Sequence, residues 1–356
     1  PPRGALPPPP ASKDLESAPV LKAAIAANRS VARLDQAANS IPNPTVLINT
    51  IPLIEAQASS EIENLVTTTD DLFRFLDDDD GADSATREAL RYRTALRVGF
   101  DETLNRPITS ATAITVYSTI KGHDMRVRDL PGTRLAHPVT GAVTYSPPEG
   151  QDVVEQKLHE WETYIHADDG LDPLIRMAVG HYQFEAIHPF ADGNGRTGRI
   201  LNILFLRQSG LLESPILYLS RYIIATKADY YRLLLAVTAE QAWEEWLLYM
   251  LRGVELSSES TLRKIAAIRE LQDTYAQRAR EFTRGSVDVE LMAVLFEQPY
   301  CRISTVVERC GVSRPTATKW LNTLAEADLL EDVRAGRDRL FINRELIDIL
   351  TRTELQ

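Results

Sequence analysis

Residues 188–199 read HPFADGNGRTGR and follow an aliphatic segment with helical spacing. Three glycines in this stretch, Gly193, Gly195 and Gly198, allow positive backbone φ angles and let a ligand approach the main chain closely. A second apolar segment with helical spacing starts at Ile200. The unpaired N–H groups and the dipole at the start of that second helix favour negative charge at the same place. The stretch therefore predicts an anion-binding loop between two core helices.

The charged side chains of this stretch indicate an oligophosphate as the anion. Arg196 and Arg199 are three residues apart, hence on one helical face, and offer forked donors suited to phosphate oxygens. Asp192 has no obvious cationic partner in the sequence, which fits a carboxylate that holds Mg²⁺ on the phosphate. His188 lies four residues earlier, at a turn fixed by Pro189, where an imidazole can take a proton from an incoming nucleophile.

Other interpretations account for parts of the stretch. Each residue alone has a structural explanation, and only their combination within twelve positions indicates a site. The phosphate-binding P-loop has a similar glycine spacing, but here Arg199 replaces its lysine, Ile200 replaces its Ser/Thr, and a helical pattern precedes it instead of a strand. A zinc site would leave the glycines and arginines without a purpose. Its three ligands would be His181, His188 and Asp192.

Length and composition limit the class of protein. A chain of 356 residues exceeds what one core usually organises and predicts two or three domains. Apolar residues make up 44% of the chain, but no apolar run approaches the roughly 18 residues of a membrane span. The net charge of −11 argues against a chain coated for nucleic acid. The proline-rich start lacks the order of a secretory signal, and two cysteines are too few for a disulfide framework, so we expect a cytoplasmic location.

The spacing of apolar residues predicts a mainly α fold in several parts. β-branched and aromatic residues on both sides of a Thr-Gly turn predict an exposed hairpin near residues 131–150. The last seventy residues have the order of elements typical of a winged helix-turn-helix, with Gly336 at the tip of its wing. The expected parts are a Pro-rich tail (1–18), an N-terminal helical region (19–105), a core (106–255), a linker helix (256–285) and the winged helix (286–356).

The stretch also matches the motif HxFx(D/E)GNGRxxR without departure, and on these residues the chain resembles the Fic (Fic/Doc) family. The N-terminal helical region and the winged helix are similar to those of its N-terminally autoinhibited members. The resemblance implies a Fic-type helical core with a β-hairpin flap. It implies a protein adenylyltransferase, which moves AMP from ATP to a Ser, Thr or Tyr hydroxyl of a target protein. Removal of AMP from a modified target, or the use of another nucleotide, stays open for the same site.

The resemblance assigns a role to each residue of the site. His188 is the base that deprotonates the target hydroxyl, and Asp192 binds Mg²⁺. The strand of the flap holds a segment of the target protein by adding it to an exposed edge. The residues assigned to ATP are Gly193, Asn194, Gly195, Arg196, Gly198, Arg199 and Tyr231, with Tyr231 against the adenine. The residues assigned to the flap strand are Val143, Thr144, Tyr145 and Ser146.

A second motif lies upstream, at residues 59–64, which read SSEIEN. The local pattern favours a capping box in which Ser60 and Glu63 start a helix. The family's inhibitory motif, (S/T)xxxE(G/N), matches the same residues through Ser59, Glu63 and Asn64. Ser59 and Glu63 are four residues apart and face the same way on a helix. The resemblance implies that Glu63 pairs with Arg199 and keeps the γ-phosphate of ATP from a productive position.

The C-terminal module introduces a function of another class, a DNA-binding regulator. Residues 286–356 carry nine Lys/Arg against twelve Asp/Glu, which is poor for phosphate attraction. We therefore favour protein docking or target presentation over DNA binding for this module. The resemblance further implies a homodimer and self-modification, besides an unidentified protein substrate. The candidate DNA contacts are Arg314, Thr316, Thr318, Lys319, Arg334 and Arg337.

Overall fold

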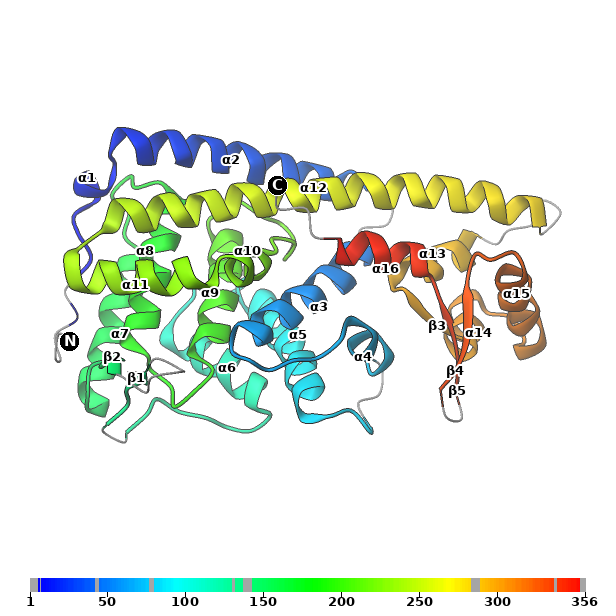
Figure 1. The fold of residues 1–356 in the computed structure, drawn as a ribbon, viewed down its shortest axis with the longest axis horizontal. Coiled ribbons are helices and arrows are strands. Elements are labelled where there is room, and N and C mark those ends of the chain that lie inside the picture. Colours follow the sequence, from blue (N-terminus) through cyan, green and yellow to red (C-terminus); the bar gives the residue numbers. More distant parts are fainter. Residues whose placement is uncertain are drawn as a thin grey trace.

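The computed structural model describes residues 6, 8–41, 45–76, 80–129, 132–136, 143–282, 289–335 and 338–352. Helices dominate the molecule, and two long ones, α2 (Ala18–Asn39) and α12 (Trp243–Phe282), run side by side along one side of it (Figure 1). The mainly α prediction is confirmed. Most of the Pro-rich tail before residue 8, the turn of the flap at residues 137–142 and the tip of the wing at Gly336 and Arg337 lie outside the described residues.

The N-terminal region is helical, as predicted. Two of its helices matter for the site. Helix α3 packs against α5, and the side chain of Asp83 caps α5 by accepting the N–H of Thr86 at 2.7 Å. The elements that accompany α2 are α1 (Ser12–Leu15), α3 (Thr45–Ile62), α4 (Thr69–Arg74) and α5 (Ser84–Glu102).

Helices α8 and α9 form the centre of the catalytic part. Asp172 caps α8 by accepting the N–H of Leu174 at 2.9 Å, and Pro173 occupies the first turn. Nearly every side chain of both helices is buried, as expected of central helices. The elements here are α6 (Ser110–Lys121), β1 (Leu135–Ala136), β2 (Val143–Tyr145), α7 (Gln151–Ile165), α8 (Pro173–Ile187), α9 (Asn194–Gln208), α10 (Leu219–Ala225) and α11 (Lys227–Glu240).

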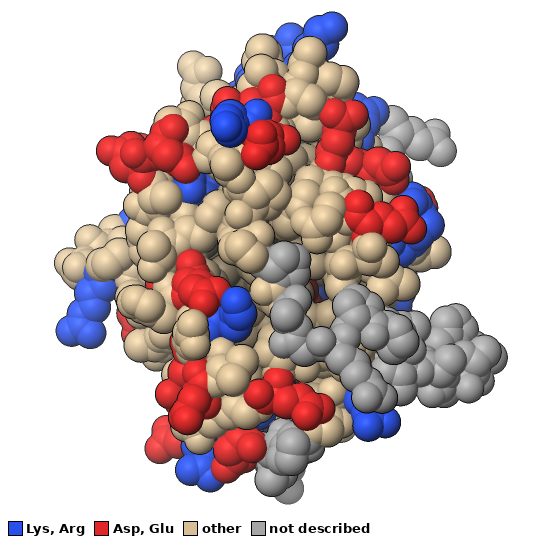
Figure 2. All heavy atoms as spheres, turned by 90° about the vertical axis from the view of Figure 1, so that its left-hand side faces the viewer, with Lys and Arg blue, Asp and Glu red and all other residues tan. Residues whose placement is uncertain are grey.

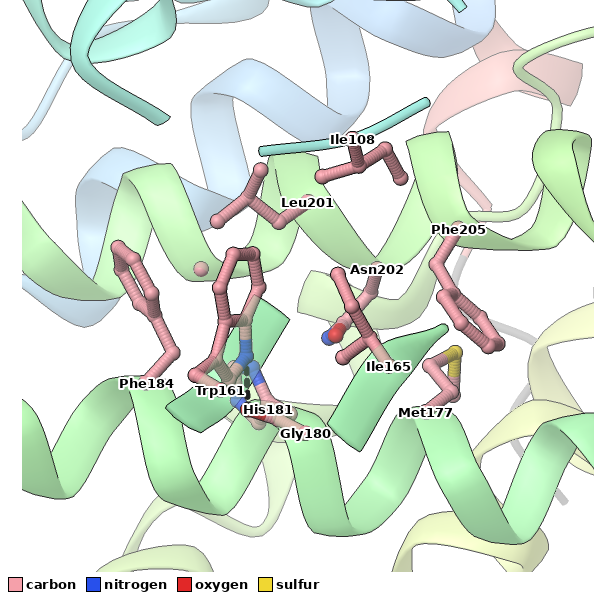
Figure 3. A pocket seen from close by; sticks show the side chains of 11 residues that line it. Ile108, Trp161, Ile165, Met177, Gly180, His181, Phe184, Leu201, Asn202 and Phe205 are labelled. Carbon is pink, nitrogen blue, oxygen red and sulfur yellow. Dashed lines mark hydrogen bonds between the residues drawn. The ribbon is translucent and has the colours of Figure 1, made fainter. Parts of the chain in front are cut away.

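A small cavity lies between α7, α8 and α9 (Figure 3). Its volume is about 20 Å³, and apolar side chains such as Trp161 and Phe205 form most of its wall. Two buried atoms of residues in the wall, Nδ1 of His181 and Nδ2 of Asn202, have no hydrogen-bond partner among the described residues. The volume suits one water molecule and not a nucleotide. The cavity is therefore a packing feature beside the loop that joins α8 and α9.

Helix α12 differs from the expected linker at residues 256–285. It is one continuous helix of 40 residues that begins inside the predicted core. Its packing partners include α2, α8 and α10, and it also packs against α15 and α16 of the C-terminal module. Lys264 Nζ donates to the carbonyls of Ile349 and Leu350, at 3.2 and 2.8 Å, at the end of α16. Residues 256–282 therefore belong to a helix that packs against both the core and the C-terminal module.

The C-terminal module lies at one end of the molecule (Figure 1). Its order of elements agrees with the predicted winged helix, and strand β3 adds to the wing to give a three-stranded antiparallel sheet with the order β3-β5-β4. Cys301 is buried and Cys310 is partly buried. The elements are α13 (Val289–Glu297), β3 (Tyr300–Arg302), α14 (Ile303–Cys310), α15 (Arg314–Glu326), β4 (Glu331–Ala335), β5 (Asp338–Ile342) and α16 (Arg344–Thr351).

The surface agrees with the acidic composition. Figure 2 shows the opposite end of the molecule from the C-terminal module, where acidic and basic side chains are interspersed among uncharged ones. Within the described residues, no helix is both long and apolar enough to cross a membrane.

Candidate active site

Helix α8 ends at His188, and the chain then turns sharply into α9. His188 adopts the left-handed conformation, with φ of 51°, and its N–H donates to the carbonyl of Phe184 at 3.1 Å. Gly193 is also left-handed, with φ of 69°, and directly precedes the first residue of α9. A residue with a side chain rarely adopts this conformation, which accounts for glycine at position 193. The motif is thus a loop between two core helices, as predicted.

Asn194 closes this loop. Its Oδ1 accepts the N–H of Phe190 at 2.8 Å, and its Nδ2 donates to the carbonyl of the same residue at 2.9 Å. Its side chain is buried, with only 1% of the residue exposed. The resemblance assigned Asn194 to phosphate oxygens. In the structure both polar groups of the Asn194 carboxamide hold the loop in shape, and its contact with phosphate oxygens stays a prediction.

Arg128 fixes the loop from outside and was missed by the sequence analysis. Its Nε donates to the carbonyl of His188 at 2.7 Å, and its own N–H donates to the carbonyl of Pro189 at 2.9 Å. Its Nη2 donates to the carbonyl of Pro148, at the base of the flap. One buried guanidinium therefore ties the catalytic loop to the flap. Arg128 lies 60 residues before His188, so no local sequence pattern indicates the contact.

The environment of His188 keeps its imidazole neutral. Burial lowers its pKa from 6.5 to about 4. The carbonyl of Glu185 opposes this shift, although it makes no hydrogen bond of good geometry with the buried Nδ1. A histidine with this pKa is unprotonated at neutral pH and is ready to accept a proton.

Glu63 lies directly on the start of α9. Its Oε1 accepts the backbone N–H of Arg196 at 2.9 Å and Nη2 of Arg199 at 3.0 Å, and its Oε2 accepts Nε of Arg196 at 2.5 Å. Both guanidinium groups are almost completely buried. The resemblance implied a pair with Arg199, and in the structure Glu63 also binds the side chain and the backbone amide of Arg196. The carboxylate therefore occupies a helix N-terminus and two arginines at once.

Ser59 reinforces this contact. Its Oγ accepts Nε of Arg199 at 2.8 Å, and its carbonyl accepts Nη2 of Arg199 at 2.9 Å. The capping box proposed from the local pattern is absent. Ser60 lies within α3, and its Oγ has no hydrogen-bond partner among the described residues. Glu63 follows the end of a helix and does not start one.

Asn64 terminates α3 and directs Glu63 toward the loop. It is left-handed, with φ of 63°. The N–H of Leu65 donates to the carbonyl of Ser60 at 3.0 Å, and the N–H of Asn64 donates to that of Glu61 at 3.0 Å. This is the Schellman pattern of a helix end, in which glycine and asparagine are preferred. It gives a physical reason for a Gly or Asn after the glutamate of the motif.

Asp192 has a cationic partner, contrary to the expectation from sequence. Lys121, the last residue of α6, places its Nζ 2.9 Å from Oδ1 and 3.0 Å from Oδ2 of Asp192. The same ammonium lies 3.1 Å from Oε1 of Glu88 on α5, and Glu88 in turn accepts Nη1 of Arg196. Sequence could not reveal this pair, because 71 residues separate its members.

Comparisons with known proteins place most of the chain in known families. The family model described as "Fic/DOC family N-terminal" matches residues 21–101, "Fic/DOC family" matches 107–206, and "Protein adenylyltransferase SoFic-like, C-terminal domain" matches 271–346. Together they extend over the N-terminal helices, the site and the C-terminal module. This chain belongs to the Fic/DOC family.

Two curated relatives illustrate how far the likeness extends. Probable protein adenylyltransferase aq_aa38 of Aquifex aeolicus (strain VF5) is 29% identical over 180 residues, which are 49% of this chain and 53% of the relative. Protein adenylyltransferase Fic of Nematostella vectensis is 27% identical over 198 residues, 55% of this chain and 42% of the relative. This Fic protein thus spans about half the length of these relatives or less.

Solved structures of the family share the fold. A Fic family protein from Desulfovibrio desulfuricans G20 has a TM-score of 0.58 at 19% identity, over 95% of this chain and 98% of its own. Fic-1 from C. elegans has a TM-score of 0.53 at 22% identity, over 69% of this chain and 74% of its own. At these identities the likeness concerns the fold.

The glycines of this Fic protein leave little room at the start of α9. A Cβ atom on Gly195 would lie 2.7 Å from Nη1 of Arg199 and 2.8 Å from Oε1 of Glu63. A Cβ atom on Gly198 would lie 2.7 Å from Oε1 of Glu185. Real Cβ atoms do not come this close, so a side chain at residue 195 would displace Arg199 and Glu63, and one at residue 198 would displace Glu185.

Asp192 is a suitable magnesium ligand in this Fic protein. Mg²⁺ is usually held by one or two carboxylates together with substrate phosphates and water. The side chain of Asp192 is 62% exposed beside the loop and already attracts a cation. Within the described ranges, no three His, Cys, Asp or Glu side chains come together as a metal site. The remaining ligands would therefore come from nucleotide and water.

Two tyrosines of α11 take different places. Tyr230 is 1% exposed, and its hydroxyl lies 2.8 Å from Nε2 of His181, a contact that engages the histidine of the zinc alternative. Tyr231 is 48% exposed, and Arg199 is among the charges that act on its hydroxyl. A solvent-accessible ring near Arg199 suits the adenine contact expected of Tyr231.

The flap is a short antiparallel pair. Strand β2 pairs with β1 in the register Leu135↔Tyr145 and Ala136↔Val143. Tyr145 anchors it, because its hydroxyl donates to the carbonyl of Ala186 at 2.7 Å, near the end of α8. Thr144 lies in β2 and Ser146 directly follows it. The four expected flap residues therefore lie in β2 or directly after it, and Tyr145 ties this strand to the end of α8.

Proposed function

We propose that this Fic protein is a protein adenylyltransferase that moves AMP from ATP to a hydroxyl side chain of a protein, including its own chain, and that Glu63 restrains it. The observation that carries the proposal is the Glu63 carboxylate, held by a helix N-terminus, Arg196 and Arg199. These donors suit phosphate oxygens equally well. An anion site filled by the protein's own carboxylate is what an autoinhibited phosphate site requires.

The chemistry follows from the neighbouring groups. The target hydroxyl attacks the α-phosphorus of ATP, its proton passes to the neutral imidazole of His188, and the bond to pyrophosphate breaks. Arg196 and Arg199 would hold the outer phosphates once Glu63 withdraws, with backbone groups at Gly193, Gly195 and Gly198 close to them. Bound Mg²⁺ at Asp192 would neutralise charge on the phosphates. Positioning and charge stabilisation supply most of the catalysis in such transfers.

The flap would align the target. An exposed edge of β2 can take an extended peptide as an additional strand, so that backbone hydrogen bonds fix the hydroxyl near His188. The hydrogen bond from Tyr145 to Ala186 would keep that strand in register with the loop. This assigns target binding to residues 143–146 and proton transfer to His188.

The test is transfer of label from α-labelled ATP with Mg²⁺ to the full chain and to lysate proteins. The variants are Glu63→Gln, Glu63→Gln/His188→Ala and, as a matched control, Glu61→Gln, which changes an exposed glutamate in the last turn of α3, two residues before Glu63. Loss of the charge-assisted hydrogen bonds should raise labelling by about ten- to a hundredfold in Glu63→Gln. Labelling should vanish with His188→Ala and stay at the wild-type level with Glu61→Gln.

Other outcomes would redirect the proposal. No label in any folded variant, together with release of AMP from a previously labelled protein, would make the enzyme one that removes AMP. Label from another nucleoside triphosphate in place of ATP would keep the site and change the substrate.

The structure offers little support for DNA binding by the C-terminal module. Four of its arginines are engaged within the protein. Arg302 donates to the carbonyl of Arg74, Arg309 pairs with Glu297, and both Arg339 and Arg344 pair with acidic neighbours. The exposed face of α15 combines Arg314 and Lys319 with Glu326. None of the four engaged arginines is among the candidate DNA contacts, so the argument against DNA binding rests mainly on the excess of Asp and Glu over Lys and Arg in residues 286–356.

A further inference from the structure

The largely buried side chain of Lys121 places its ammonium group between two carboxylates, those of Asp192 and Glu88. Its side chain is 17% exposed, and its Nζ lies 2.9 and 3.0 Å from the two oxygens of Asp192 and 3.1 Å from Oε1 of Glu88. The hydroxyl of Tyr117, one turn earlier on α6, adds a contact of 3.4 Å to Oδ1 of Asp192. Neither oxygen of the carboxylate expected to bind metal is therefore without a partner.

These contacts extend into the contacts of Glu63. Glu88 accepts both Lys121 and Arg196, and Arg196 also binds Glu63. Burial raises the pKa of Glu88, but the hydrogen bonds from Arg196 and Lys121 outweigh it and hold the pKa below its ordinary value. Glu88 therefore stays ionised and joins the two cations. Acidic and basic groups alternate from Asp192 to Glu63.

A metal ion and the ammonium compete for one carboxylate. Mg²⁺ requires a carboxylate oxygen at about 2.0–2.1 Å and tolerates little distortion. Lys121 binds both oxygens of Asp192, and its positive charge repels the ion as well. When the ammonium leaves Asp192, Glu88 still pairs with it, so the displaced cation keeps a partner.

We propose that Lys121 is a second restraint on the site, a built-in cation that occupies Asp192 in the resting protein and is displaced when a metal–nucleotide complex binds. The inference rests on the proposed function, which makes Asp192 the metal ligand. Lys121 is a positioning residue of the resting state, because it acts on the metal only through Asp192 and takes no part in the transfer itself.

The test measures metal binding without turnover. The full chain with Glu63→Gln is titrated with Mn²⁺ in the presence of a non-hydrolysable ATP analogue, and free Mn²⁺ is followed by electron paramagnetic resonance. Lys121→Met should lower the half-saturating concentration of Mn²⁺ by about two- to fivefold, the range of a partly exposed ion pair. Lys121→Arg should stay at the parent value, because arginine keeps the charge. Lys121→Gln serves as a second neutral variant if the methionine variant does not fold.

Two further variants separate direct competition from general effects. Glu88→Gln leaves Asp192 as the partner of Lys121 and should raise the half-saturating concentration of Mn²⁺. Lys121→Met should lower it. A general loosening of the site would instead change this concentration in the same direction in both variants. Arg91→Met removes a neighbouring cation that contacts the carbonyl of Lys121 but not Asp192, and should stay at the parent value. An unchanged or higher half-saturating concentration in folded Lys121→Met and Lys121→Gln overturns the inference. Absence of Mn²⁺–nucleotide binding in the parent, or full binding in Asp192→Asn, instead overturns the proposed function.

Discussion

His188 can act as a base only while its imidazole is neutral, and the structure sets the pH range of that form. Burial lowers its pKa to about 4, so the base form is lost as pH falls through the lowered value and not near 6.5. We expect kcat/KM of the Glu63→Gln variant to be flat between about pH 6 and pH 8 and to fall only at more acidic pH. Initial labelling rates across that range measure it. An acid limb centred near the ordinary histidine value would contradict the buried environment.

Arg128 is the residue that most affects the position of His188 without being in the motif. Replacing it by alanine releases the carbonyls of His188 and Pro148 that its guanidinium holds. Because small displacements of a reacting group are costly, we expect labelling to fall by about ten- to a hundredfold in Arg128→Ala. Arg126→Ala is the matched control, since Arg126 is 84% exposed on the same segment. Equal losses in both variants would show a general effect on that segment.

At the scale of elements, the end of α3 decides where Glu63 lies. Asn64→Val places a β-branched side chain at a positive φ of 63° and should lower the free energy of unfolding by about 1–2 kcal/mol. Labelling should rise as well, because the same strain moves Glu63 off the arginines. Asn64→Gly should keep both properties near wild type, because glycine accepts this conformation. Denaturant unfolding and label transfer measure both variants. An Asn64→Val variant that stays inhibited would show that inhibition by Glu63 does not depend on the conformation of this helix end.

Sequence predicted the features that depend on neighbouring residues. The loop between α8 and α9 and the order of elements in the C-terminal module both follow from local patterns. It did not predict that α12 continues through residues 243–282, because Gly253, close to the expected boundary, does not end the helix but packs against Tyr222. The lower boundary of the expected linker helix was therefore misplaced.

The contacts between distant residues could not be predicted from sequence. Lys121, Glu88 and Arg128 lie on other elements from the motif, and each is an ordinary surface residue in its local pattern. Lys121 and Glu88 contact charged side chains, and Arg128 contacts backbone carbonyls, that come close only in the folded chain. The capping box at Ser60 is an error of the other kind, a local pattern that wrongly predicted a helix start. In the structure Ser60 lies in the last turn of the buried helix α3.

At the scale of the molecule, the C-terminal module docks on the segment that carries Glu63. Helices α13 and α16 pack on α3, and the ring of Tyr300 stacks on Phe73 of α4 with centroids 5.9 Å apart. The hydroxyl of Tyr300 donates to Asp70, and Arg302 donates to the carbonyl of Arg74 at 3.0 Å. The module therefore supports both the helix before Glu63 and the helix after it.

This arrangement predicts that a less firmly packed C-terminal module weakens the inhibition by Glu63. Tyr300→Ala removes a buried ring and should lower the free energy of unfolding by about 3 kcal/mol, whereas Tyr300→Phe loses one hydrogen bond, worth about 1 kcal/mol. Labelling should rise in Tyr300→Ala and change little in Tyr300→Phe. In the Glu63→Gln background Tyr300→Ala should add nothing, because the carboxylate whose position it disturbs is already gone. The same increase in both backgrounds would mean that Tyr300 acts on the site by a route that does not pass through Glu63.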